Sequence, residues 1–329
     1  MRALPACCLL AAALAGASLQ AYQTFGIVVD GRVVEVKWPS QPVRYYITNR
    51  GVPRVSAEDF RGAAARALAS WQGVKGASTA AEFVAFTSAE PFDDDGRVVL
   101  GFQNRPDLDR VLGATTFLVD RVTGEIVESD IFFNSAFPWS VSGESGRFDL
   151  ESIVLHETGH LFGLGHSAIG ETELRAGGGR TVIAAEAVMF PIAFPAGNTS
   201  ARTPRPDDEA GLSSLYPREG VTAETGTISG RVTRDGQGVL GAHVVAFDPE
   251  TGALVGGFTV NAQGDFTIAR LEPGSYLLRA EPVDDADLDS FFDDARGVDV
   301  DFRVAYHDRM VSVPKGGGAP AVEIKVVRK

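Results

Sequence analysis

The chain has 329 residues, of which 44% are apolar and 22% are charged, as in a folded protein rather than a disordered one. Its 43 acidic and 30 basic side chains give a formal net charge of −13. This balance argues against nucleic acid and anionic membranes as partners, because neither is attracted to an acidic surface.

The first residues predict a cleaved secretory signal, assigned to residues 1–21. Arg2 is the only charged residue ahead of an apolar run at residues 3–14 that has the length of a signal-peptide core. The sequence offers two cleavage sites, one at the small residues 15–17 and one after Ala21. The run is shorter than the ~20 apolar residues that cross a bilayer, so no membrane span is predicted. Both cysteines lie in this segment, so we expect a secreted, extracellular chain without disulfides.

Helices and strands alternate through residues 22–217. Strands are predicted at residues 42–48, 82–87, 97–102, 113–119 and 125–133. A helix opened by Ser56 carries Phe60, Ala64 and Leu68 on one face, with Trp71 one turn further on.

Two more helices follow in the same part of the chain. Asp149 is a predicted N-cap for a helix that runs through an apolar stretch into a group of histidines. A short third helix is predicted at Pro206, where proline at the first turn precedes the acidic pair Asp207 and Asp208.

A change in composition marks the second half of the chain. Residues 218–226 are polar, contain glycine and are predicted to be a linker. Short alternating strands separated by turn residues are then predicted at residues 227–232, 242–247, 265–269, 275–280, 310–313 and 322–327. With no long helix among them, residues 227–329 predict an all-β sandwich.

The motif that indicates a metal-dependent reaction starts at His156 and reads His-Glu-Thr-Gly-His-Leu-Phe-Gly-Leu-Gly-His. Residues four apart on a helix point the same way, so His156 and His160 can offer ring nitrogens to one metal. Gly163 can end the helix in a left-handed conformation. His166 then lies where the returning chain would supply a third ligand.

Three neutral imidazoles leave an open position on a zinc ion, which is typical of catalytic rather than structural zinc. Glu157, beside the first ligand, can accept a proton from the attacking water and pass it to the leaving amine. The sequence therefore predicts one catalytic zinc and a glutamate general base for peptide-bond hydrolysis.

These residues resemble the matrixins among the metzincin zinc metalloproteases. Ser167 follows the third histidine as it does in matrixins, and the Val-Met-Phe-Pro run around Met189 resembles the family's Met-turn, an apolar floor beneath the ligands. Asp207 and Asp208 resemble the start of the helix that closes the matrixin domain. Met189, Gly163 and Asp207 are assigned as structural support for the site. The resemblance covers about residues 35–217. It implies an α/β (α+β) domain with a mixed sheet and an active-site helix, and peptide binding along a strand edge, assigned to residues 113–119.

The sequence also departs from the matrixin pattern. No histidine precedes His156, and Phe132 and Asn134 stand where a histidine and an aspartate are expected, which argues against a second, structural zinc. The mature chain has no cysteine with which a pro-domain could cap the zinc. The stretch at residues 167–187 is predicted to be a long loop near the substrate cleft.

The second half resembles the carboxypeptidase regulatory-like, transthyretin-like sandwich, through Ser-Gly-Arg-Val from Ser229 and Leu-Glu-Pro-Gly-Ser-Tyr from Leu271. His243 and His307 are predicted to be ordinary strand residues. Calcium is a further candidate cofactor without an assigned site, since the acidic run at residues 284–294 lacks the spacing of a calcium loop.

Together these observations predict a secreted zinc endopeptidase, expected to be a monomer, that acts on protein or peptide substrates. Two alternatives stay open. One is an extracellular binding or adhesion protein with a vestigial protease domain, and the other is a processing protease of narrow specificity. Because every assigned site residue precedes residue 218, removal of the sandwich is expected to spare the hydrolysis of short peptides.

Overall fold

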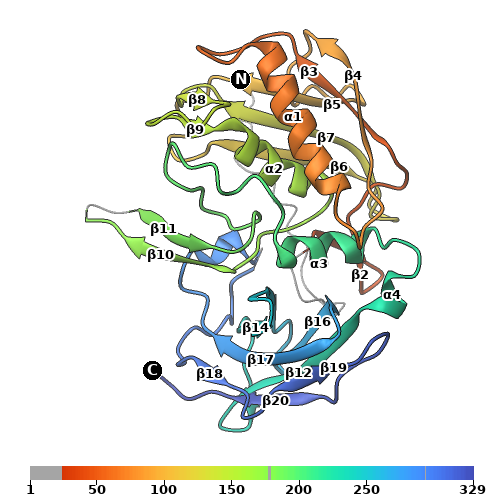
Figure 1. Cartoon of the computed structure of the whole chain (residues 1–329), viewed down its shortest axis with the longest axis vertical. Helices are drawn as coiled ribbons and strands as arrows, with labels where there is room; N and C mark the ends of the chain where they lie inside the picture. Colours follow the sequence, from red (N-terminus) through yellow and green to blue (C-terminus); the bar gives the residue numbers. More distant parts are fainter. Residues whose placement is uncertain (1–23, 177–178, 293) are drawn as a thin grey trace.

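The computed structural model describes residues 24–176, 179–292 and 294–329. They form an N-terminal domain of helices and strands (residues 24–217) and a C-terminal domain built almost wholly of strands (residues 226–329), as Figure 1 shows. The predicted fold class is confirmed. The predicted signal segment lies outside the described residues. Within the described ranges, no helix is both long and apolar enough for a membrane crossing.

A five-stranded sheet organises the N-terminal domain, in the order β4-β3-β5-β7-β6. Neighbouring strands are parallel except at the edge, where β6 runs antiparallel to β7. The bounds are β3 Val43–Thr48, β4 Ala81–Thr87, β5 Val98–Gln103, β6 Gly113–Val119 and β7 Ile126–Asn134. All five strands predicted for this domain are present, with ends shifted by one residue at most.

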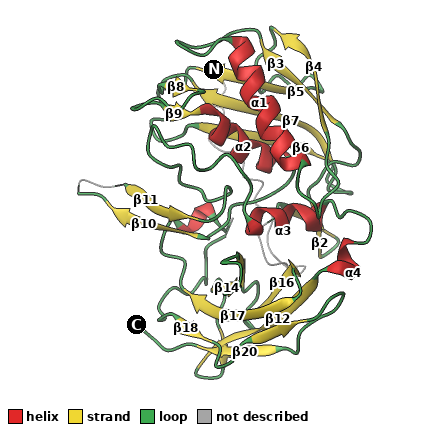
Figure 2. Ribbon diagram, in the orientation of Figure 1, coloured by secondary structure: helices red, strands yellow, loops and turns green. Residues whose placement is uncertain are grey.

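Two helices, α1 (Ala57–Gln72) and α2 (Leu150–Leu161), pack against each other and against this sheet (Figures 1 and 2). Both begin at the predicted caps. The Ser56 hydroxyl accepts from the Asp59 amide while the Asp59 carboxylate accepts from the Ser56 amide. Asp149 caps α2 in the same position.

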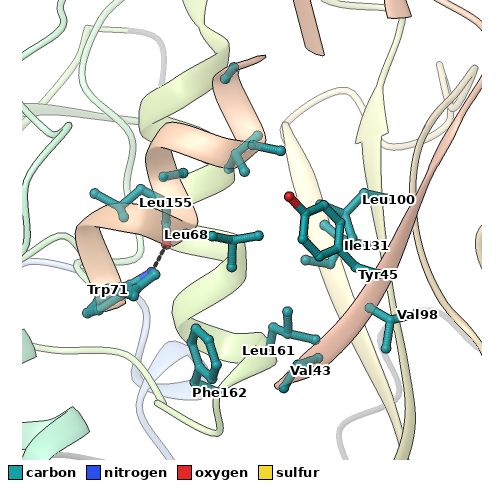
Figure 3. Packing of buried hydrophobic residues seen from close by; sticks show 14 of the residues in the cluster. Val43, Tyr45, Leu68, Trp71, Val98, Leu100, Ile131, Leu155, Leu161 and Phe162 are labelled. Carbon is teal, nitrogen blue, oxygen red and sulfur yellow. Dashed lines mark hydrogen bonds between the residues drawn. The ribbon is translucent and has the colours of Figure 1, made fainter. Parts of the chain in front are cut away.

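The core between helices and sheet fixes the position of α2. Trp71 on α1 is fully buried, and its indole Nε1 donates to the Leu155 carbonyl at 2.9 Å (Figure 3). Leu68 packs between the helices and the sheet, toward Tyr45 and Leu100. The face predicted for α1 is buried as expected, at Phe60, Ala64 and Leu68. This packing holds the middle of α2 against α1.

Several small elements were not predicted. They are the hairpin β1–β2 (Gly26–Val29 and Arg32–Glu35), the short strands β8 (Trp139–Ser140) and β9 (Phe148–Asp149), and the hairpin β10–β11 (Gly170–Leu174 and Arg180–Ala185). The last hairpin occupies the stretch predicted to be an irregular loop.

The C-terminal domain consists of two facing sheets, one around β12, β16 and β20 and the other around β14, β15 and β17. The bounds are β12 Gly226–Arg234, β13 Gln237–Gly238, β14 His243–Phe247, β15 Leu254–Phe258, β16 Asp265–Leu271, β17 Gly274–Glu281, β18 Ala305–Tyr306, β19 Val311–Val313 and β20 Val322–Lys325. A single 3₁₀ turn, Leu288–Ser290, precedes β18. The predicted sandwich is therefore present, with β13, β15 and β18 as additions.

The junction between the domains is packed. Helix α3 (Pro206–Leu215) begins as predicted and gives Leu212 to the N-terminal core and Ala210 to the C-terminal core. The predicted linker contains a short helix, α4 (Val221–Glu224), and its Arg218 amide donates to the Gly76 carbonyl. The two domains are thus held by shared packing at the segment that joins them.

Candidate metal centre

Helix α2 presents His156, Glu157 and His160 to one side of the N-terminal domain. Glu157 and His160 are 5% and 8% exposed, and His156 is half-buried. The helix is anchored at its start by the Asp149 carboxylate, which accepts from the Ser152 amide at 3.0 Å. The predicted i, i+4 arrangement of the two histidines is therefore present on a rigid element.

A glycine ends α2 and turns the chain back. Gly163 has a φ of +96°, and a Cβ atom there would lie 2.2 Å from the Val36 carbonyl oxygen. Only glycine fits this position. The turn brings His166 to the other two histidines.

The three histidines form one cluster. Ring centroids are 4.8 Å apart for His156 and His160, 4.8 Å for His160 and His166, and 5.4 Å for His156 and His166. One ring nitrogen from each lies within 4.8 Å of the others. Among the residues that the structure describes, no second group of metal-binding side chains comes together.

The opposite nitrogen of each ring contacts a backbone carbonyl. Nδ1 of His156 lies 2.8 Å from the Val188 oxygen, and Nδ1 of His160 lies 2.8 Å from the Leu164 oxygen. Nδ1 of His166 lies 2.8 Å from the carbonyl oxygen of Ser290, in the C-terminal domain. A carbonyl can only accept, so each Nδ1 carries the proton and each Nε2 keeps its lone pair. This donor set fits a zinc ion, which binds neutral imidazole nitrogens.

Burial also keeps the cluster neutral. Burial, together with the neighbouring His166, lowers the pKa of His156 to about 3. Burial likewise lowers the pKa values of His160 and His166. Neutral rings are the form that a metal requires.

Glu157 is a buried carboxyl beside this cluster. Burial raises its pKa to about 7, against a hydrogen bond from Thr115 that favours the ionised form. The Thr115 hydroxyl lies 2.8 Å from Glu157 Oε2. A Cβ atom at Gly113 would lie 3.1 Å from Glu157 Oε1, so β6 leaves little room around the carboxyl. Such a group can exchange a proton near neutral pH from a fixed position.

Met189 lies under α2, as a Met-turn would place it. A Cβ atom at Gly159 would lie 2.3 Å from its Sδ atom, so the sulfur touches the helix backbone directly. The turn is held by Asp208, whose carboxylate accepts from the amides of Val188 at 2.8 Å and Met189 at 3.0 Å. Burial, together with the adjacent Asp207, raises the pKa of Asp208 to about 7.

The structure separates the two acids that the sequence treats as a pair. Asp207, assigned as structural support, accepts from the Gly256 amide at 2.8 Å and from the Ser167 hydroxyl, so it joins the domains. Asp208 instead supports Met189 and was not assigned. Adjacent residues on a helix point about 100° apart, which is why one faces the turn and the other the sandwich.

A cleft runs past the cluster between the two domains. Its walls include β6, α2 and the C-terminal residues 258–263 and 286–292. In the described ranges β6 pairs with β7 alone, so its outer edge has no strand partner. The part played by the C-terminal domain in this cleft was not predicted, because no local pattern reports a contact made across 124 positions of sequence.

Asn134 and Phe132, the two positions that depart from the matrixin pattern, make contacts unrelated to a metal. Asn134 is fully buried, and its side chain binds the carbonyls of Arg105, Leu108 and Val111. Phe132 packs edge-on against Phe92. Asn134 therefore shapes the loop that leads into β6.

Two family models match the chain. The model for matrixin matches residues 37–175, and the model for the carboxypeptidase regulatory-like domain matches residues 227–286. No curated protein matches it. The matrixin match includes α2 and all three histidines, and the matrixin family implies zinc. The chain thus contains a region that matches matrixin, followed by one that matches the carboxypeptidase regulatory-like domain, in the order that its sequence predicts.

Proposed function

We propose that this protein is a secreted zinc-dependent endopeptidase. The observation that supports it best is the convergence of three neutral histidines, each fixed through Nδ1, beside a buried carboxyl with a pKa of about 7. The match to matrixin agrees with this assignment.

His156, His160 and His166 would hold the zinc through Nε2. A zinc ion in such a site supplies Lewis-acid chemistry, polarising a carbonyl and making water more acidic. The burial of Met189 and Glu157 limits access of bulk water, so charges that develop in the site interact strongly.

Glu157 is the proposed general base. Its carboxylate accepts a proton from the attacking water, and the resulting acid donates that proton to the amine that leaves. The Thr115 hydroxyl donates to one carboxyl oxygen, Oε2, at 2.8 Å, and Glu157 lines the cleft.

The substrate is proposed to be an extended peptide that pairs with the free edge of β6. Main-chain hydrogen bonds from an edge strand recognise backbone rather than side chains. Because Thr115 lies on β6 and contacts Glu157, a peptide paired there would lie next to the base. This geometry favours cleavage at internal bonds over removal of terminal residues.

The test is a cleavage assay on a proteome-derived peptide library, using protein recovered from the medium of a secreting host. We expect internal cleavages that a chelator stops and that added Zn²⁺ restores. Recovered chains should begin near Tyr22, which tests export in the same preparation.

The outcome also separates the alternatives. Many cleaved sequences would support a general endopeptidase, and very few would support a narrow processing enzyme. Intact peptides after zinc loading would contradict the proposal and favour a binding protein with a vestigial protease domain.

A further inference from the structure

We propose that residues 287–292 of the C-terminal domain are a positioning part of the metal centre, acting through the Ser290 carbonyl on His166. The proposal rests on the proposed function, since it concerns how the same three histidines are held. It assigns the C-terminal domain a role inside the active site.

The three histidines depend on different parts of the chain for their Nδ1 acceptors. His156 and His160 use the carbonyls of Val188 and Leu164, both in the N-terminal domain. His166 uses the Ser290 carbonyl, at the same distance of 2.8 Å. Within the described residues, the orientation of the third ring is therefore set from outside the domain that carries it.

The segment is held in place from its own domain. The Ser290 amide donates to the Asp287 carbonyl at 2.9 Å, which closes a 3₁₀ turn. The next residue, Phe291, is 4% exposed and packs against Phe258 at 5.9 Å between ring centroids. Phe291 therefore anchors the carbonyl that His166 uses.

The hydrophobic cluster that contains Phe258 and Phe291 also contacts the N-terminal domain. Ala168 and Ile192 of the N-terminal domain pack against Phe291 and its neighbours. On the hairpin β10–β11, the Thr172 amide donates to Asp285 Oδ1 at 2.6 Å and the Thr172 hydroxyl donates to the Asp285 carbonyl at 2.8 Å. These contacts join the chain just before Ser290 and the residue after it to the N-terminal domain, so the Ser290 carbonyl is held by packing from both domains.

Loss of this acceptor has a definite physical consequence. The ring of His166 would no longer be fixed about its side-chain torsions, and a buried N–H would lose its partner. Removal of such outer partners of metal-binding histidines typically costs 10–100-fold in metal affinity. The expectation that the sandwich is dispensable for short peptides therefore does not follow from the structure.

The experiment measures the zinc dissociation constant by competition with a chelator, on the full-length chain. Phe291→Ala removes the anchor, and a second variant replaces residues 288–292 with a glycine-serine segment of equal length. Ser290→Ala is the matched control, because it deletes the hydroxyl and keeps the carbonyl. Val313→Ala truncates a buried side chain of the C-terminal core away from the cleft.

We expect Phe291→Ala and the segment replacement to weaken zinc binding by about 10–100-fold, with both controls unchanged. Visible absorption of the Co²⁺-loaded proteins should differ in the same two variants, because a reoriented imidazole changes the ligand field. If Phe291→Ala does not fold, the zinc affinity of the segment replacement tests the proposal instead.

Two contrary results are distinguishable. Wild-type protein that binds no zinc would contradict the proposed function itself. Wild-type affinity in a folded Phe291→Ala protein and in the segment replacement would overturn the positioning role while leaving the zinc site intact.

Discussion

Replacing Glu157 by glutamine is expected to lower peptide hydrolysis by about 10²–10⁴-fold, the range for loss of a general acid–base group. The amide keeps the size of the side chain and can still accept from Thr115, which lies 2.8 Å from Oε2. It cannot take a proton from the attacking water. Zinc content should stay at the wild-type level, because the proposed ligands are His156, His160 and His166. Initial rates on a short peptide, with metal measured in the same sample, check this.

Glu151→Gln provides a matched control. Glu151 is a second buried glutamate on α2, but its carboxylate pairs with Arg66 at 2.6 Å instead of facing the cluster. Its replacement should leave the turnover of folded protein near the wild-type value. Near-normal turnover in Glu157→Gln would mean that another group is the base.

Replacing His166 by alanine is expected to have the largest effect on metal. The change removes one of the three proposed ligands, so the loss of zinc affinity should exceed the 10–100-fold typical of an outer partner. Zinc content after dialysis, measured by elemental analysis, should fall well below one ion per chain, and hydrolysis should fall with it.

His307→Ala is the control for that variant, since His307 lies in the C-terminal domain and contacts the Arg309 carbonyl. It should retain zinc and activity. A full zinc complement in His166→Ala would show that this residue is not a ligand.

Local patterns were enough to predict most of the N-terminal domain. Ser56 and Asp149 are caps whose hydrogen bonds depend on residues three positions away, so sequence alone finds them. The turn at Gly163 was predictable for the same reason, because an α-helix that must reverse within three residues needs a left-handed position.

Strand β15 shows where such reasoning fails. Gly256 and Gly257 interrupt its run, and glycine normally counts against a strand. In the structure a Cβ atom at Gly256 would lie 2.5 Å from Nε2 of His243, so the strand requires glycine for a tertiary reason. The hairpin β10–β11 was missed similarly, because the glycine-rich sequence between its two strands is typical of a long loop.

The candidate site also has one part that local sequence predicts and one part that depends on tertiary contacts. The cluster of His156, His160 and His166 follows from helical spacing and one turn, and was predicted as a set. The support from Asp208 and Ser290 depends on which face of a helix meets which segment after folding. Periodicity locates ligands that share a helix, whereas only the tertiary structure shows which carbonyls and carboxylates fix them.

The most direct test of the account is diffraction from crystals of the wild-type protein at the zinc absorption edge. We predict one strong anomalous peak bounded by Nε2 of His156, His160 and His166, at bond lengths of about 2.0–2.1 Å. A peak bound elsewhere, for example at His243 and Glu281, with no metal among the three histidines, would contradict it.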